Sequence, residues 1–126
     1  MRLLIVAASR KEIVPLLTGR ESNMGGNPDV IQWTSHQNQV DVIITGVGMV
    51  PTVYWVTRML NINDYDYAIN AGICGSFNKS FPIGQVYQVI EDSFPEVGAE
   101  DDDGFLSLRD LRLSDLNEFP YSDGII

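Results

Sequence analysis

The chain has 126 residues, of which 44% are hydrophobic and 20% charged, and this length and composition predict one globular domain with one core. Its 17 acidic and 8 basic residues give a net charge of −9, which argues against nucleic acid as a partner, because binding to a phosphate backbone relies on clustered Lys and Arg. No apolar run approaches the roughly 18 residues that span a bilayer, so we expect no membrane partner.

The first elements are predicted by residues 3–8, a continuous apolar run that is typical of a strand covered on both faces. Charged side chains follow at once, so the run is too short and wrongly flanked for a signal peptide. Ser9 and Glu12 match the capping-box pattern that begins a helix, and Pro15 limits the length of that helix.

Further elements follow in order. Residues 30–33 and 40–44 predict two strands of a hairpin, joined by the polar turn 36–39. Apolar residues at helical spacing predict a helix over 50–60, and residues 67–70 predict another strand. The polar, glycine-containing residues 19–28 indicate a surface loop before the hairpin.

The last third of the chain changes character. Residues 83–90 alternate apolar and polar side chains, which predicts a half-exposed strand. Residues 91–126 form an acidic segment of uncertain order. Its run 100–103 lacks the glycine and terminal glutamate of an EF-hand, so we interpret it as a solvated loop and not as a calcium site.

Residues 70–76, Asn-Ala-Gly-Ile-Cys-Gly-Ser, interrupt the apolar pattern just after a predicted strand. Gly72 and Gly75 let the backbone approach a ligand, but they also suit a tight bend, and spacing alone does not choose between the two. Cys74 lies between these glycines. Since no histidine is near it in the sequence, we expect a small buried thiol and not a nucleophile.

Gly46 and Gly48 stand between a strand and a helix, as in the opening of a dinucleotide-binding turn, but the third glycine is missing and Thr52 stands near its place. We therefore give an NAD site little weight and expect no cofactor. The turn can still present backbone N–H groups to an anion or a hydroxyl.

His36 and Cys74 are the single histidine and the single cysteine, so neither an internal disulfide nor a zinc site of the usual composition can form. We expect no metal ion and a reducing, cytoplasmic setting. Glu12 lies near the end of the first predicted strand, where open α/β sheets place their ligands. Closing a capping box with Ser9, worth about 1 kcal/mol, explains this glutamate as well, and the local sequence favours that second interpretation.

Taken in order, these motifs resemble the N-terminal half of the nucleoside phosphorylase and nucleosidase superfamily. The chain is most similar to futalosine hydrolase, an enzyme of an alternative menaquinone route, and then to the nucleosidases that cleave methylthioadenosine or S-adenosylhomocysteine. The resemblance implies an α/β fold, a mixed and largely parallel central sheet flanked by helices, as a single domain over 1–126 that is incomplete at its C-terminal side. The segments that carry it are residues 1–17, 45–48, 70–75, 83–86, 89–94 and 98–101.

The resemblance also implies roles for residues. Glu12 matches the glutamate that activates the attacking water as general base. Asn70 stands where phosphorylases of the superfamily have an arginine, which favours water over phosphate as the nucleophile. A homo-oligomer is expected. The positions that match the lining of the nucleoside pocket are Ala8, Ser9, Val47, Ile73, Cys74 and Gly75.

The chain departs from the family in one respect. The second half of the family fold supplies a glutamate that holds the ribose hydroxyls and an aspartate that helps to protonate the leaving purine, and this sequence ends before either motif. The resemblance therefore predicts a purine nucleoside hydrolase in truncated form, and it leaves open whether the 126 residues are an enzyme. The alternative is a non-catalytic fragment that binds nucleosides or associates with itself.

Overall fold

The computed structural model describes residues 1–20, 28–123 and 125–126. The chain divides into two compact units, Met1–Phe77 and Asn78–Ile126. The single domain expected from the sequence stays a prediction. Most of the predicted elements fall in the first unit, which also contains the buried core.

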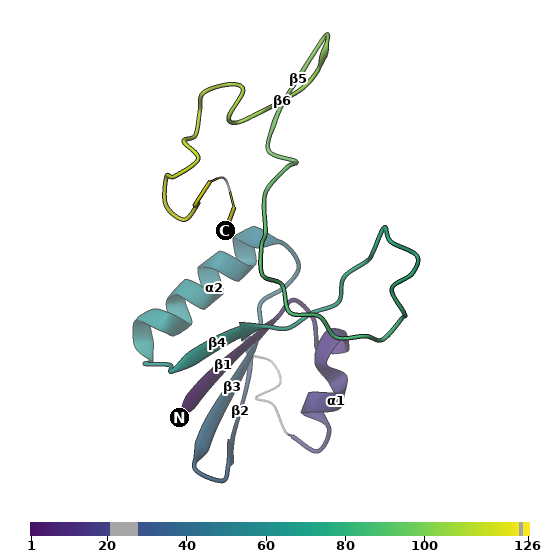
Figure 1. Cartoon of the computed structure of the whole chain (residues 1–126). Coiled ribbons are helices and arrows are strands. Elements are labelled where there is room, and N and C mark those ends of the chain that lie inside the picture. Colours follow the sequence, from purple (N-terminus) through teal and green to yellow (C-terminus); the bar gives the residue numbers. More distant parts are fainter. Residues whose placement is uncertain (21–27, 124) are drawn as a thin grey trace. The chain divides into compact units, whose positions relative to one another are not determined.

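The first unit is built on a four-stranded sheet with the order β2-β3-β1-β4 (Figure 1). The central strand β1 (Arg2–Ala7) lies parallel to β3 (Asn38–Ile44) on one side and to β4 (Tyr67–Asn70) on the other. The edge strand β2 (Asp29–Ser35) pairs antiparallel with β3. This arrangement confirms the predicted α/β fold with a mixed, largely parallel sheet.

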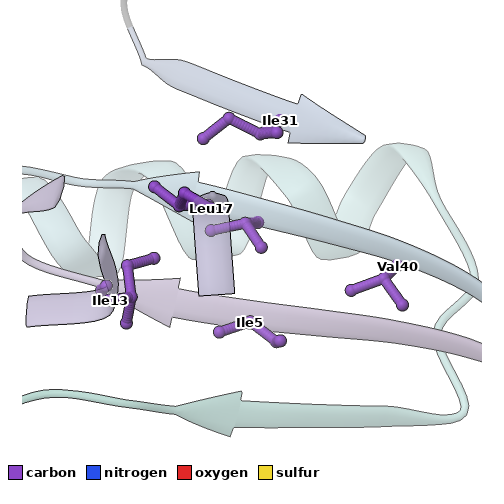
Figure 2. Close-up of a cluster of buried hydrophobic side chains, with 7 residues drawn as sticks. Ile5, Ile13, Leu17, Ile31 and Val40 are labelled. Atoms are coloured by element: carbon purple, nitrogen blue, oxygen red, sulfur yellow. The ribbon is translucent and has the colours of Figure 1, made fainter. Parts of the chain in front are cut away.

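Both faces of β1 are covered, as its continuous apolar run predicted. Because side chains alternate along a strand, Ile5 and Ala7 face one layer and Leu4 and Val6 face the other. The first layer holds the short helices η1 (Arg10–Ile13) and α1 (Val14–Leu17), and Figure 2 shows its apolar cluster. The second layer holds α2 (Met49–Ile62), which packs Met59 against the sheet.

The helix predicted after Ser9 is confirmed only as two single turns, the 3₁₀ turn η1 and then α1. Pro15 lies in the first turn of α1, where a missing N–H is tolerated, and α1 ends two residues later. The helix predicted over 50–60 is longer, since α2 begins directly after Gly48 and ends before Asn63. No helix within residues 1–20, 28–123 and 125–126 is both long and apolar enough to cross a membrane.

The predicted hairpin is confirmed, but its turn is shorter than expected. Asn38 is already part of β3 and pairs with Ser35, so only His36 and Gln37 connect the strands. His36 has φ +54°, the left-handed conformation that two-residue hairpin turns require. The loop predicted over 19–28 lies largely outside the described residues, which omit 21–27.

The buried carboxylate of Asp41 connects β1, β2 and the segment before β4 through hydrogen bonds. Asp41 on β3 has no exposed surface, and its Oδ2 accepts hydrogen bonds from Arg2 Nη2 at 2.7 Å and from the Tyr65 hydroxyl at 2.7 Å. Its Oδ1 accepts one from Gln32 Nε2 at 2.9 Å. The backbone N–H of Asp66 donates to the carbonyl oxygen of Arg2 at 2.9 Å. These contacts fix the residues that directly precede β4.

The second unit contains one antiparallel hairpin, β5 (Gly98–Asp101) and β6 (Gly104–Ser107), within the acidic segment. The strand predicted over 83–90 is wrong: these residues have no regular structure and are exposed, with Ile83 and Val86 almost fully accessible. Alternating side chains favour a strand only where the backbone finds a pairing partner, and no described residue of this unit pairs with 83–90.

Candidate functional site

A hollow of about 340 Å³ lies at the carboxyl ends of the three parallel strands β1, β3 and β4, beside the first turn of α2. Open α/β sheets bind their ligands at this end because the loops that leave the strands surround it. All residues around the hollow belong to the first unit. They are Ala8, Glu12, Thr45, Gly48, Met49, Thr52, Asn70, Ala71, Gly72 and Ile73.

Glu12 contributes the one carboxylate among these lining residues, and its orientation is set by Ser9. The backbone N–H of Ser9 donates to Glu12 Oε2 at 2.6 Å, and the Ser9 hydroxyl donates to the same oxygen at 3.2 Å. These bonds are the capping-box contact that the sequence predicted. No described residue donates a hydrogen bond to the second oxygen, Oε1, so this atom is available to a ligand or to water.

Gly72 brings the segment after β4 against that free oxygen. The backbone N–H of Ala71 donates to the carbonyl oxygen of Val6 at 2.8 Å, which continues the pairing of β4 with β1 by one residue. A Cβ on Gly72 would lie 3.3 Å from Oε1 of Glu12, closer than most side-chain contacts. Gly72 therefore permits close packing of the backbone against the carboxylate, and the approach of a ligand to this segment stays a prediction.

The turn between β3 and α2 forms another part of the wall. Gly46 has φ +91° and Gly48 has φ +101°, which are backbone conformations that residues other than glycine rarely adopt. Thr45 before the turn is buried, and its hydroxyl oxygen lies 3.1 Å from that of Thr52 on α2. Met49 completes this part of the lining.

The structure places the seven residues predicted for the site unequally. Ala8, Glu12 and Ile73 line the hollow. Ser9 does not line it, but its backbone N–H donates a hydrogen bond to the carboxylate of Glu12. The other three do not line it, and among them Cys74 is exposed. The expectation of a buried thiol is wrong, because the segment after Ala71 leaves the sheet and has no covering layer among the described residues of its unit. The other three residues are Val47, Cys74 and Gly75.

Sequence reasoning did not identify seven of the lining residues as pocket residues. Thr45 and Gly48 belong to a turn that the sequence did single out, so its placement after a strand was a usable signal. Thr52 was noted only as a substitute for a glycine. Its role depends on a contact across the turn that no spacing rule predicts. The remaining missed residues are Met49, Asn70, Ala71 and Gly72, of which Asn70 and Gly72 had been noted for other reasons.

The second unit has a hollow of its own, of about 310 Å³, lined mainly by apolar side chains. It contains none of the residues predicted for the site, so we place the candidate site in the first unit. In the part of the chain that the structure describes, no group of three His, Cys, Asp or Glu side chains is arranged to hold a metal ion. Residues that line this second hollow include Phe94, Leu108, Arg109, Asp115 and Tyr121.

Scans of protein-family models and of curated proteins found no match to the chain. Solved structures do match, and they show the fold: the matched part of the chain is folded like the corresponding part of two Helicobacter pylori enzymes. Particular matches are the D198N mutant of H. pylori MTAN with 5'-methylthioadenosine in the active site, at 24% identity and a TM-score of 0.56, and a second structure of H. pylori MTAN, at 24% identity and a TM-score of 0.54. A third is a mutant of H. pylori futalosine hydrolase, at 23% identity and a TM-score of 0.56.

These matches cover 65–66% of this chain but only 37–39% of the solved chains. The chain thus spans less than two-fifths of their length. At this identity the likeness establishes the fold, and it confirms the nucleosidase-type fold that the resemblance implied.

Proposed function

We propose that this chain carries the first part of a purine nucleoside N-ribohydrolase, which cleaves the N-glycosidic bond of futalosine or of a related purine nucleoside such as 5'-methylthioadenosine. The observation that carries the proposal is the position of Glu12. Its carboxylate lies in a hollow at the carboxyl ends of the parallel strands, in a fold shared with nucleosidases that include a futalosine hydrolase. A purine nucleoside is therefore the proposed ligand.

Glu12 acts in this proposal as the general base. Ser9 holds Oε2, so Oε1 is the atom that takes a proton from the attacking water. The water oxygen bonds to the anomeric carbon while the bond to the purine nitrogen breaks, through an oxocarbenium-like state. The electron pair of the broken bond passes to the purine, which leaves after taking up a proton.

Water is favoured over phosphate as the nucleophile by the residues that surround the hollow. A phosphate ion needs a cation or several donors in its site. None of the described lining residues is Arg or Lys, and Asn70 occupies the end of β4. This supports hydrolysis in preference to phosphorolysis.

The proposed enzyme acts in the cytoplasm. If futalosine is the substrate, the enzyme belongs to an alternative route of menaquinone biosynthesis. We further propose self-association of the chain. The outer face of α2 supports this, because Val50, Val53 and Tyr54 are 83%, 64% and 56% exposed, and exposed apolar surface of this kind is often an interaction site. Neither nucleic acid nor membrane is among the proposed partners.

A second candidate function is nucleoside binding without catalysis, or self-association alone. It is favoured by the single carboxylate, Glu12, among the described residues around the hollow. Without a second acid to protonate the leaving purine, the rate falls by about 10²- to 10⁴-fold. Weak binding with negligible turnover would then be the property of this chain.

Purine release separates the two functions. The chain is incubated with futalosine and with 5'-methylthioadenosine, and hypoxanthine or adenine is measured by chromatography. Binding of both nucleosides is measured in parallel by calorimetry. Release of either purine supports the hydrolase, and binding without release supports the second function. The absence of both release and binding contradicts both candidates at this site.

A further inference from the structure

Two threonine hydroxyls form a polar pair beneath the glycine turn of the hollow. Thr45 directly follows β3 and is only 5% exposed. Its hydroxyl oxygen lies 3.1 Å from that of Thr52, 3.0 Å from the carbonyl oxygen of Gly46 and 3.4 Å from that of Ala7. The Thr52 hydroxyl donates to the carbonyl oxygen of Gly48 at 2.9 Å. The pair thus connects the end of β1, the turn and α2.

The hydrogen bonds of the two hydroxyls depend on each other, because each hydroxyl has only one proton. Each hydroxyl has one proton to donate, and the contact between Thr45 and Thr52 uses one of the two. If Thr45 donates to Thr52, then Thr52 donates to Gly48. If the order is reversed, Thr45 donates to Gly46 or to Ala7. In either order the pair holds a backbone carbonyl, and removal of one hydroxyl changes the bonds of the other.

The turn 46–48 contains two glycines, which have no side chains that could hold the backbone in one conformation. Gly46 and Gly48 both have positive φ and no side chain that could pack, so the segment loses more conformational freedom on folding than it would with other residues at these two positions. A Cβ on Gly46 would make only ordinary contact with Pro51, so space alone does not hold the turn. The hydroxyl pair adds to two backbone hydrogen bonds at the ends of the turn, from the N–H of Thr45 to the carbonyl oxygen of Ala7 at 3.0 Å and from the N–H of Thr52 to that of Gly48 at 3.4 Å.

We propose that Thr45 and Thr52 are positioning residues of the ligand site, whose paired hydroxyls hold the turn 46–48 in the shape that completes the wall of the hollow. Thr45, Gly48 and Thr52 line the same hollow as Glu12, so a change in the pair alters the space offered to the ligand. The inference rests on the proposed function, since it takes a purine nucleoside as the ligand. It assigns no chemical step to either threonine.

The test compares affinity with stability in a set of variants of the whole chain. The dissociation constant for 5'-methylthioadenosine is measured by titration of the backbone amide NMR signals, and the melting temperature is measured on the same samples. The variants of the pair are Thr45→Val, Thr52→Val, the double variant and Thr45→Ser. Thr57→Val, an exposed threonine on the same helix, and Ile31→Val, in the apolar cluster of the other sheet face, are the controls.

Loss of one positioned hydrogen bond predicts about tenfold weaker binding for Thr45→Val and for Thr52→Val. The double variant is expected to bind little more weakly than either single one, because the two hydroxyls share their bonds. Thr45→Ser keeps the hydroxyl and is expected to retain affinity. Ile31→Val lowers the melting temperature without changing the dissociation constant, and Thr57→Val changes neither.

Unchanged affinity in Thr45→Val would overturn the proposal, and so would an equal loss of affinity in Ile31→Val, which would show that stability alone controls binding. If the native chain does not bind the nucleoside, the proposed function fails, and the ligand-free spectra decide the positioning claim. Thr45→Val should then shift the amide signals of Gly46 and Gly48 while Thr45→Ser leaves them in place. Unshifted signals in Thr45→Val would refute it.

Discussion

The carboxylate of Glu12 lies against the backbone of Gly72, so closely that a Cβ on Gly72 would be 3.3 Å from Oε1. The two residues come from different elements, η1 and the segment after β4, which meet at the carboxyl ends of β1 and β4. Gly72 leaves Oε1 accessible in the hollow, and Ser9 holds the other oxygen.

The substitution Gly72→Ala should impair the site more than the fold. The added methyl group crowds the end of a flexible side chain, so we expect the free energy of unfolding to change by less than about 1 kcal/mol. Displacement of the carboxylate should lower purine release by about tenfold or more, because small errors in position are costly in catalysis. Chromatographic assays and urea denaturation measure the two effects.

Gly75→Ala is the matched comparison, because an added Cβ there meets nothing within 4 Å. We expect normal activity and stability. A loss of activity in Gly75→Ala would instead support the pocket role that the family resemblance implies for this residue.

The two interpretations of Glu12, cap and base, are separated by Glu12→Gln and Glu12→Ala. Glutamine can still accept the hydrogen bond from Ser9, so the capping box and the melting temperature should be retained, whereas no base remains and purine release should be lost. Alanine should lose purine release and about 1 kcal/mol of stability as well. Glu96→Gln, an exposed position of the second unit, is the control. Full activity in Glu12→Gln would show that Glu12 is only a cap.

Asp41→Asn should destabilise the first unit strongly. It removes the charge from a fully buried carboxylate that pairs with Arg2 and accepts bonds from Tyr65 and Gln32. Asp41 is buried and the Arg2 side chain is 26% exposed, so removal of the carboxylate charge weakens a partly buried ion pair, and we expect a loss of about 1–3 kcal/mol in urea denaturation. The exposed Asp64→Asn should lose less than about 0.5 kcal/mol. Equal effects of the two substitutions would contradict this role for Asp41.

Stability should fall in alkaline solution because of Tyr65. Burial, and then its hydrogen bond to Asp41, raise the pKa of Tyr65 above the ordinary value of 10.0. Above pH 10 the unfolded chain therefore loses this proton before the folded chain does, so the folded state binds more protons and stability declines as pH rises. Below pH 10 the contribution is fully present. In Tyr65→Phe, denaturation midpoints should decline less steeply above pH 10, and an identical decline would exclude Tyr65 as the cause.

The fold of the first unit could largely be predicted because its signals are local. The run 3–8 is apolar on both faces since helices cover both, and residues 67–70 proved to be β4. Residues 83–90 show the limit of this reasoning. Their alternation favours a strand, but strand formation requires hydrogen bonds from a partner, and alternation contains no information about whether a partner is present.

The site could be predicted in part for the same reason. The place of Glu12 after β1 made it a candidate, its spacing from Ser9 favoured a cap, and only the family resemblance implied its role as a base. The close approach of Gly72 to Glu12 and the Thr45–Thr52 pair depend on how strands meet at the edge of the sheet. Cys74 was misplaced because small residues are usually buried, whereas this one follows a strand that lies at the edge of the sheet.

The central claim is that water, activated by Glu12, cleaves a purine nucleoside in the hollow. The most direct test is to incubate the chain with futalosine in water enriched in oxygen-18, with inorganic phosphate present, and to analyse the sugar product by mass spectrometry. We expect the native chain to release hypoxanthine and a free sugar that contains one oxygen-18 atom, and we expect Glu12→Gln to release neither product. A sugar phosphate as product, or no release by the native chain, would contradict it.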